Sequence, residues 1–390
     1  MQKNQRCFVG RSGNLLQLKP CTVDIYKFHH AIVKDVSGLQ PWRVDHGHKP
    51  ARYTYGLFCR KSFVNFPFRF LRPLLGVCFT VLALPALAQP APLFVLNSLD
   101  ASVSVIDPVK WTETRRIPTG KQPHHIYLTP DEKSVIVANA LSDSLTFIDP
   151  RTAQVQREVR GILDPYHLRF SPDMKWFVTA ANRLNHIDIY RWDGTNVTLV
   201  KRIATGKTPS HLWIDSKSTT VYATMQDSNE LVAIDLSSQT VKWRTPTGSI
   251  PADVFGTADD KFMLVGLTGG DEVEVYDISG KQPQRSRVIK TGAGAHAFRA
   301  FGDGRHVLVS NRVANSISKI DLQTFTVVDV FPAPGGPDCM DISRDGKLIY
   351  VTSRWARKLT VIDIASRKVV QQVNVGKSPH GVWTLDHAPR

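Results

Sequence analysis

The stretch Gly120-Lys-Gln-Pro-His-His-Ile-Tyr-Leu-Thr-Pro-Asp131 decides the fold, because related versions of it recur along the chain. The proline is the easiest position to follow, and successive copies lie 42, 44, 42, 44, 42 and 42 residues apart. This position is filled by Pro123, Pro165, Pro209, Pro251, Ala295, Pro337 and Pro379. The sequence therefore contains a seven-fold internal repeat.

A second marker has the same period. An alternating apolar run that ends in aspartate recurs in six copies, with its last residue at Asp107, Asp149, Asp235, Asp277, Asp321 and Asp363. Tyr190 takes this place in the remaining copy. A period of about 40–45 residues built from short alternating strands is typical of a propeller blade. The aspartates are expected to form the turns that follow these strands.

Each repeat is predicted to form four strands, which in one complete copy span residues 124–129, 134–139, 145–149 and 155–160. The first unit begins with a second strand at Leu93, whereas the chain ends with a first strand, His380 to Leu385. The sequence therefore predicts an all-β, seven-bladed propeller of four-stranded blades over residues 89–390. The ring would be closed by a blade shared between the N- and C-termini, which leaves no free sheet edge at the seam.

Residues 69–88 have the features of a secretory signal peptide. Arg69 and Arg72 precede an apolar run over residues 74–84, and the segment ends in a small-residue cleavage site at Ala88. The run is shorter than the roughly 20 apolar residues that a membrane-spanning helix needs. We therefore expect export to the periplasm or secretion, and no transmembrane segment once the signal is removed.

The mature chain is expected to begin at Gln89. Residues 1–68 show no sustained helical or strand period. We interpret them as a non-structural extension or as the product of a misassigned translation start.

Charge and cysteine are concentrated before the repeats. The formal net charge is +15, but residues 1–88 contribute +10 of it, so residues 89–390 carry only +5. This modest charge argues against nucleic acid as the partner. Of the five cysteines only Cys339 follows residue 88, which excludes an intrachain disulfide or a cysteine-based zinc site within the repeats.

Histidines gather directly after the repeated proline. Six of the nine histidines that follow residue 88 occupy this two-residue window, namely His124, His125, His167, His211, His296 and His380. Asp253, Asp338 and Cys339 fill the same window in other repeats. First strands line the channel of a propeller, so these side chains are expected to meet there. Clustered imidazoles are the usual ligands of Cu, Zn or Ni, and Cu or Zn is the cofactor we expect. The alternative is that each imidazole only bonds to a neighbouring blade.

Basic residues occupy the loops at the same end of the predicted propeller. They are Arg183, Arg312, Arg354, Lys121, Lys207 and Lys377. Together they predict a cationic channel mouth, which would favour an anionic small molecule or cofactor.

Short motifs in the repeats point to a known family. Ile349-Tyr-Val-Thr-Ser353 and Val221-Tyr-Ala-Thr224, with the aspartate-ending strands and Gly-x-x-Pro loops, resemble the YVTN repeat of surface-layer proteins and YncE-like periplasmic propellers. The resemblance covers about residues 93–385. It implies the propeller fold and a binding platform, and related propellers occur in lactonases, lyases and haem or copper proteins.

These observations favour an exported, monomeric binding protein that holds a metal ion or an anionic small molecule at the His- and Arg-lined mouth. Whether it is also an enzyme stays open. A lactonase- or lyase-type propeller would use His and Arg to polarise a carbonyl and a histidine as base. A scaffold that binds a periplasmic protein without metal is the third possibility. The sequence contains no H-E-x-x-H, G-x-S-x-G or Walker motif.

Overall fold

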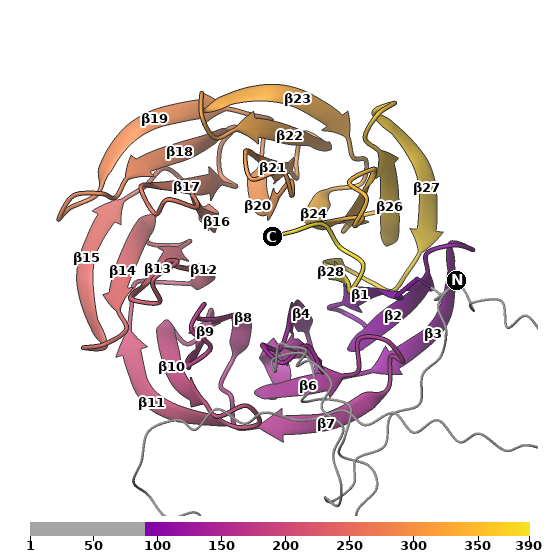
Figure 1. Ribbon diagram of the computed structural model, residues 1–390, viewed down its shortest axis with the longest axis horizontal. Coiled ribbons are helices and arrows are strands. Elements are labelled where there is room, and N and C mark those ends of the chain that lie inside the picture. The colour runs from indigo at the N-terminus through magenta and orange to yellow at the C-terminus, as the bar shows by residue number, and fades with distance from the viewer. Residues whose placement is uncertain (1–89) are drawn as a thin grey trace, which may run out of the picture. The chain divides into compact units, whose positions relative to one another are not determined.

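The computed structural model describes residues 90–390, which form a ring of seven four-stranded antiparallel sheets around a central channel (Figure 1). The predicted seven-bladed, all-β propeller is thus confirmed. The predicted signal peptide at 69–88 and the segment 1–68 lie outside the described residues.

The strands follow one another from the inside of each blade to the outside. Blade by blade, in chain order, their bounds are β1 Leu93–Asn97, β2 Ser102–Asp107 and β3 Thr112–Pro118; β4 Pro123–Leu128, β5 Val135–Asn139, β6 Ser144–Ile148 and β7 Val155–Arg160; β8 Pro165–Phe170, β9 Trp176–Ala181, β10 His186–Trp192 and β11 Val197–Ala204; β12 Pro209–Ile214, β13 Thr220–Met225, β14 Glu230–Asp235 and β15 Thr240–Pro246; β16 Pro251–Gly256, β17 Phe262–Leu267, β18 Glu272–Asp277 and β19 Gln284–Lys290; β20 Ala295–Ala300, β21 His306–Asn311, β22 Ser316–Asp321 and β23 Thr326–Pro332; β24 Pro337–Ile342, β25 Leu348–Ser353, β26 Lys358–Asp363 and β27 Lys368–Asn374; and β28 Pro379–Thr384. A 3-10 turn, η2 (Ala140–Ser142), follows β5.

Burial falls from the middle of a blade to its outer edge. In the second blade β5 is buried throughout, whereas β7 alternates between exposed and half-buried residues. The apolar side chains of the middle strands pack between neighbouring blades, as Phe94, Val103 and Ile148 do in the cluster that joins the first two blades. Burial on both faces explains why the middle strands are rich in Val and Ile.

The two ends of the described chain share one blade. β28 pairs with β1 in an antiparallel register that places Phe94 opposite Trp383, and Figure 1 shows these strands side by side. Both side chains are almost completely buried. The predicted closure of the ring by both termini is therefore confirmed.

A bulge near the start of each innermost strand decides which side chains face the channel. In β4 the pairing with β5 shifts between Pro123 and Ile126, and a shift occurs in the same part of the other six innermost ladders. A bulge breaks the strict alternation of a strand. Two consecutive residues, such as His124 and His125, can therefore both reach the channel.

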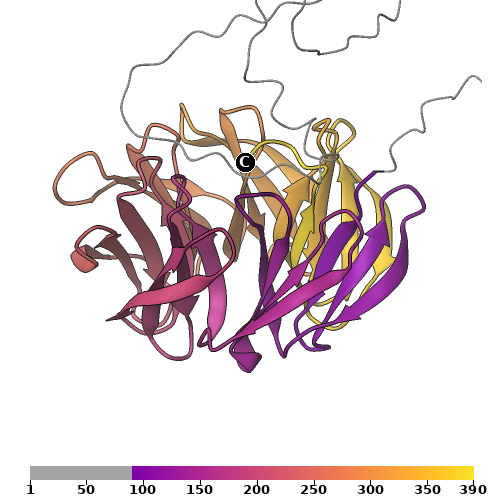
Figure 2. The same cartoon turned by 60° about the horizontal axis from the view of Figure 1, so that its bottom comes forward.

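A C-terminal strap, residues 386–390, follows β28 and lies over the end of the channel where the innermost strands finish (Figure 2). Its backbone bonds to the neighbouring blade, with Ala388 N donating to the carbonyl oxygen of Ile342 at 2.9 Å. Arg299 donates to the carbonyl oxygens of Ala388 and Pro389 at 2.7 and 2.9 Å. The strap is thus fixed across this end by main-chain and side-chain bonds.

Candidate functional site

The six predicted histidines meet in the middle of the channel. Each comes from the beginning of an innermost strand, on β4, β8, β12, β20 or β28. All are buried, with at most 6% of any side chain exposed. His124 and His125 are neighbours in sequence, and their ring centroids lie 3.6 and 4.9 Å from that of His380. The window after the repeated proline therefore supplies one compact cluster.

The cluster has two tiers along the channel axis. The first tier comprises the residues directly after the proline position and contains His124, Tyr166, His296, Asp338 and His380. The second tier comprises the next residue of each strand and contains His125, His167, His211, Asp253 and Cys339. Because all seven innermost strands run in the same direction, the second tier lies nearer the C-terminal strap.

The second tier contains a histidine trio, His125, His167 and His211. Their ring centroids are 4.4 to 4.7 Å apart, and one nitrogen of each ring lies within 4.8 Å of the other two. Four buried nitrogens of the trio have no hydrogen-bond partner among residues 90–390; they are His125 Nε2, His167 Nδ1, His211 Nδ1 and His211 Nε2. These are atoms that a metal ion could take as ligands.

Two neighbours orient the trio from outside. Asp253 Oδ1 lies 2.9 Å from His211 Nδ1, although the two atoms are poorly aligned for a hydrogen bond. Asp253 is itself held, since it accepts from Phe298 N at 2.7 Å. The hydroxyl of Tyr127 lies 3.2 Å from His167 Nε2. A carboxylate behind a metal-binding imidazole fixes the ring and raises its basicity.

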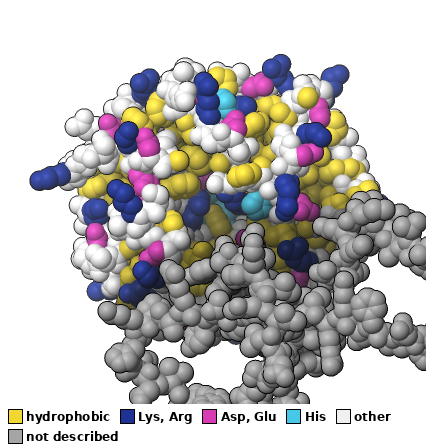
Figure 3. All heavy atoms as spheres, viewed as in Figure 1, with side chains coloured by type: hydrophobic (Ala, Val, Ile, Leu, Met, Phe, Trp, Pro, Cys, Tyr) yellow, Lys and Arg dark blue, Asp and Glu magenta, His cyan; other side chains and the backbone are white. Residues whose placement is uncertain are grey.

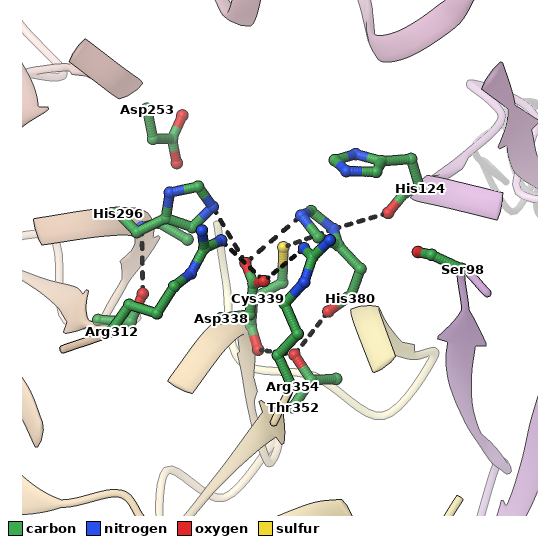
Figure 4. Close-up of polar contacts among 12 residues, drawn as sticks. Ser98, His124, Asp253, His296, Arg312, Asp338, Cys339, Thr352, Arg354 and His380 are labelled. Carbon is green, nitrogen blue, oxygen red and sulfur yellow. Dashed lines mark hydrogen bonds and ion pairs between the residues drawn. The ribbon is translucent and has the colours of Figure 1, made fainter. Parts of the chain in front are cut away.

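Asp338 is the centre of the first tier (Figure 4). Its Oδ2 accepts from Arg312 at 2.8 Å and Arg354 at 2.9 Å, and its Oδ1 lies 3.0 Å from His296 Nε2 and 3.4 Å from His380 Nε2. His296, Asp338 and His380 also form a group whose ligand atoms lie within 4.8 Å of one another. The two guanidinium groups outweigh the single carboxylate, however, and repel a cation from this group.

Burial keeps the imidazoles of His125, His167 and His296 neutral. It lowers the pKa of His125 and His167 well below 6.5, and the neighbouring imidazole of His211 lowers the pKa of both further. The pKa of His296 falls to about 4 because of burial and the charge of Arg312. Neutral imidazoles can bind metal without first losing a proton.

Asp338 and Cys339, which also belong to the cluster, are each kept in one protonation state. Burial alone would raise the pKa of Asp338, but Arg312, His380 and His296 lower it well below its usual value, so it is an anion. Burial and Asp338 raise the pKa of Cys339 well above 9.0, so it stays a thiol. A thiol is a poor metal ligand, so Cys339 does not extend the donor set.

The predicted basic residues separate into three sets. Arg312 and Arg354 reach the first tier through Asp338. Arg183 instead pairs with the buried Asp164 at 2.8 Å and donates to the carbonyl oxygen of Ala140 at 2.7 Å. The lysines Lys121, Lys207 and Lys377 lie exposed on the loops. Within residues 90–390, Lys377 is the only one of the three that pairs with an acid, Asp100, at 3.8 Å.

A cavity of about 280 Å³ lies between the histidine trio and the C-terminal strap. Basic and histidine side chains are visible around the hollow at the centre of the ring in Figure 3. The cavity wall includes residues that the sequence reasoning missed; four of them are Tyr127, Arg169, Trp213 and Arg299. All four stand four residues after the repeated proline, and this shared position is the signal that could have found them.

The remaining histidines lie elsewhere and bond locally. His186 Nε2 is 3.5 Å from Asp188, and His306 Nδ1 is 2.6 Å from Asp303. His387 belongs to the C-terminal strap and bonds to the carbonyl oxygen of Ala388. None of the three takes part in a group of metal-ligating side chains within residues 90–390.

Comparison with known proteins gives consistent matches. The chain is 28% identical over 165 residues to the uncharacterized protein YncE of Salmonella typhimurium, a match that covers 41% of this chain and 46% of that protein. It thus spans about half the length of the curated relative. A functionally unknown protein from Desulfotomaculum acetoxidans has a similar structure, with a TM-score of 0.66 at 15% identity over 75% of this chain and 98% of the other.

The periplasmic gluconolactonase PpgL of Pseudomonas aeruginosa is also similar in fold, with a TM-score of 0.65 at 18% identity over 75% of this chain and 98% of that chain. Within residues 90–390, none of the helical segments is long and apolar enough to cross a membrane. The model of a family described as YNCE-like beta-propeller matches residues 73–390. This chain therefore belongs to the YncE-like β-propeller family.

Proposed function

We propose that this propeller is an exported binding protein that holds one divalent transition-metal ion, Cu²⁺ or Zn²⁺, on the histidine trio His125, His167 and His211. The observation that carries the proposal is the set of buried, unpartnered nitrogens on three converging imidazoles. A polar atom buried without a partner costs about 1–3 kcal/mol. A bound metal ion that took one nitrogen from each ring would satisfy three of them at once.

The chemistry of the donor set supports Cu²⁺ or Zn²⁺ over harder ions. Imidazole nitrogen suits Cu and Zn, whereas Mg and Ca prefer oxygen ligands. Metal–nitrogen bonds of about 2.0–2.1 Å require the rings to close around the ion, because the ligand atoms lie within 4.8 Å of one another. Three protein ligands would leave at least one coordination position open, and the trio faces the 280 Å³ cavity.

The alternative explanation is that the imidazoles only pack against one another. His167 and His211 are indeed stacked, with an interplanar angle of 27°. Stacking covers the ring faces, but it leaves at least one nitrogen of each ring without a partner. Packing therefore accounts for the contacts of the trio and not for its polar atoms.

The test is metal content. Protein stripped with a chelator, incubated with excess Zn²⁺ or Cu²⁺ and dialysed should retain one ion per chain by elemental analysis. Protein that retains neither metal would contradict the proposal. In that case a metal-free platform for a periplasmic protein, as considered for YVTN-type propellers, would be the better account.

A second candidate, a lactone-opening enzyme, is favoured by the arrangement around Asp338. The buried His380 is neutral because burial lowers its pKa well below 6.5, so it can accept a proton from an attacking water. Arg312 and Arg354 could stabilise charge on the carbonyl oxygen. The fold similarity to a gluconolactonase is compatible with this role. Hydrolysis of gluconolactone by metal-free protein, lost in His380→Gln, would establish it.

A further inference from the structure

We infer that the cavity between the histidine trio and the C-terminal strap is a binding site for a small organic carboxylate with a flat apolar body, anchored by Arg169. The inference does not depend on the metal, because it stands on the wall of the cavity and on one arginine. It goes beyond the proposed metal site by naming the class of molecule that the channel takes.

Arg169 is held in place with most of its donors unused. It lies on β8, half-buried, with its guanidinium carbon 4.7 Å from the centre of the Trp213 ring and 5.4 Å from that of Tyr127. Its Nε donates to the carbonyl oxygen of Leu212 at 2.9 Å. Within residues 90–390 no hydrogen bond or ion pair involves its two terminal nitrogens. A pre-positioned guanidinium with free N–H groups matches the geometry of a carboxylate.

The other arginines at this cavity are already occupied. Arg299 donates to Asp341 at 2.9 Å and to three carbonyl oxygens, two of them in the C-terminal strap. Arg390 donates to the second oxygen of Asp341 at 2.8 Å. Both therefore serve to attach the strap. Arg169 is the arginine on this wall whose terminal nitrogens are free.

The charges that surround the cavity favour an anion. Its lining contains Arg169, Arg299 and Arg390 against one carboxylate, Asp253. Asp253 is already turned toward His211 and Phe298 N. Asp341 lies behind the wall and offsets the charge of one arginine of the strap. The net charge of these side chains is therefore still positive, and it favours an anion beside the free guanidinium of Arg169.

The wall between Arg169 and the strap is largely aromatic. Phe170, Trp213, Phe255 and Phe298 line it together with Tyr127. The volume of about 280 Å³ lies at the small end of the roughly 300–1,000 Å³ typical of pockets for small molecules. Aromatic rings stack on flat apolar groups, whereas a fully hydrated ion such as inorganic phosphate would lose its water without compensation. The cavity is therefore expected to bind an aromatic or similarly flat monocarboxylate.

Benzoate is a suitable probe, and benzamide is its uncharged counterpart of the same shape. Calorimetric titration of the metal-free full chain with benzoate should give one site per chain. Benzamide should bind at least about tenfold more weakly, since a charge-assisted hydrogen bond contributes roughly 1.5–3 kcal/mol. Repeating the benzoate titration with Zn²⁺-loaded protein shows whether metal at the histidine trio changes the affinity for benzoate.

Arg169→Gln should weaken benzoate binding about tenfold or more, and Arg169→Lys should restore part of it. Arg191→Gln is the matched control, because Arg191 also stacks on an aromatic ring, Trp176, but lies outside the cavity; it should bind benzoate like the parent. Absence of benzoate binding, equal affinity for benzamide, or an unchanged affinity in folded Arg169→Gln would each overturn the inference. Benzoate binding by a chain that takes no metal would leave it standing while removing the proposed metal site.

Discussion

The imidazole of His380 lies against that of His124, with ring centroids 3.6 Å apart, and its Nδ1 is 2.9 Å from the main-chain carbonyl oxygen of His124, 256 residues away in sequence. His124 is the second residue of β4, the innermost strand of the first complete blade, and His380 is the second residue of β28, the strand that closes the ring. The contact therefore joins the seam of the propeller to the candidate site. Proper closure and a correctly formed channel depend on the same strand.

Deleting residues 379–390 should abolish cooperative unfolding. The deletion removes β28 and with it Trp383, which packs against Phe94, and it leaves β1 without its inner partner. A thermal melt followed by circular dichroism should show a broad transition or aggregation. Deleting only residues 386–390 keeps β28 and should preserve a sharp transition. A sharp melt for the longer deletion at the parent midpoint would contradict the role assigned to β28.

Acidification should destabilise the fold between about pH 6.5 and pH 4. The pKa of His296 is lowered by burial from 6.5 to about 4, so within this window the unfolded chain binds a proton that the folded chain does not. Stability then falls as pH falls, by roughly 3 kcal/mol for a shift of this size. Denaturant titrations at pH 7 and pH 4.5 measure the loss. His296→Gln should lose less stability over the same range, and an equal loss would contradict the assignment.

Asp253→Asn should weaken Zn²⁺ binding by about 10–100-fold, because the loss of a carboxylate that orients a metal-binding imidazole typically lowers metal affinity by this factor. The carboxamide keeps an acceptor for Phe298 N but removes the charge beside His211. Asp277→Asn is the control, because Asp277 lies outside the channel at the end of β18, where it accepts from Ser279 N. Competition titration with a chelating dye gives both affinities. Equal affinities in the two variants would show that Asp253 does not position the site.

Processing should remove the N-terminal segment. The small-residue site at Ala88 predicts that the exported protein begins at Gln89. Intact-mass measurement and N-terminal sequencing of protein from the periplasmic fraction of its native host would detect this end. Retention of residues 69–88, or a peptide from residues 1–60 in the native protein, would contradict the predicted signal peptide or the misassigned start.

Much of the fold could be predicted from the sequence because a repeat shows its own period. The innermost strands begin at the predicted proline position, and the shared blade of β28 and β1 has the predicted partners. The aspartates at the ends of the third strands form the expected turns, since Asp107 Oδ1 accepts from Val109 N and Lys110 N. Turns of this kind depend on residues that are close together in the sequence, so they can be predicted from it.

The site could be predicted only in part. The window that supplies the histidines follows from the repeat, but the bulge that turns two successive residues into the channel has no sequence marker. Ion pairing also depends on the three-dimensional arrangement: Arg312 joins the site because Asp338 of the next blade lies beside it, whereas Arg183 is held by Asp164. The sequence does not single out Arg169, because nothing marks one arginine on one strand as a site residue until the fold places it on the cavity wall.

Titration of the full chain with Zn²⁺ and Cu²⁺, beside a variant in which His125, His167 and His211 are changed to Gln, tests the metal proposal most directly. Gln is chosen over Ala because all three side chains are buried. The parent should bind one ion per chain. The triple variant should bind none with comparable affinity, and a variant of His186 and His306, which lie outside the channel cluster, should match the parent. Unchanged binding in a folded triple variant, or no binding by the parent, would contradict the account.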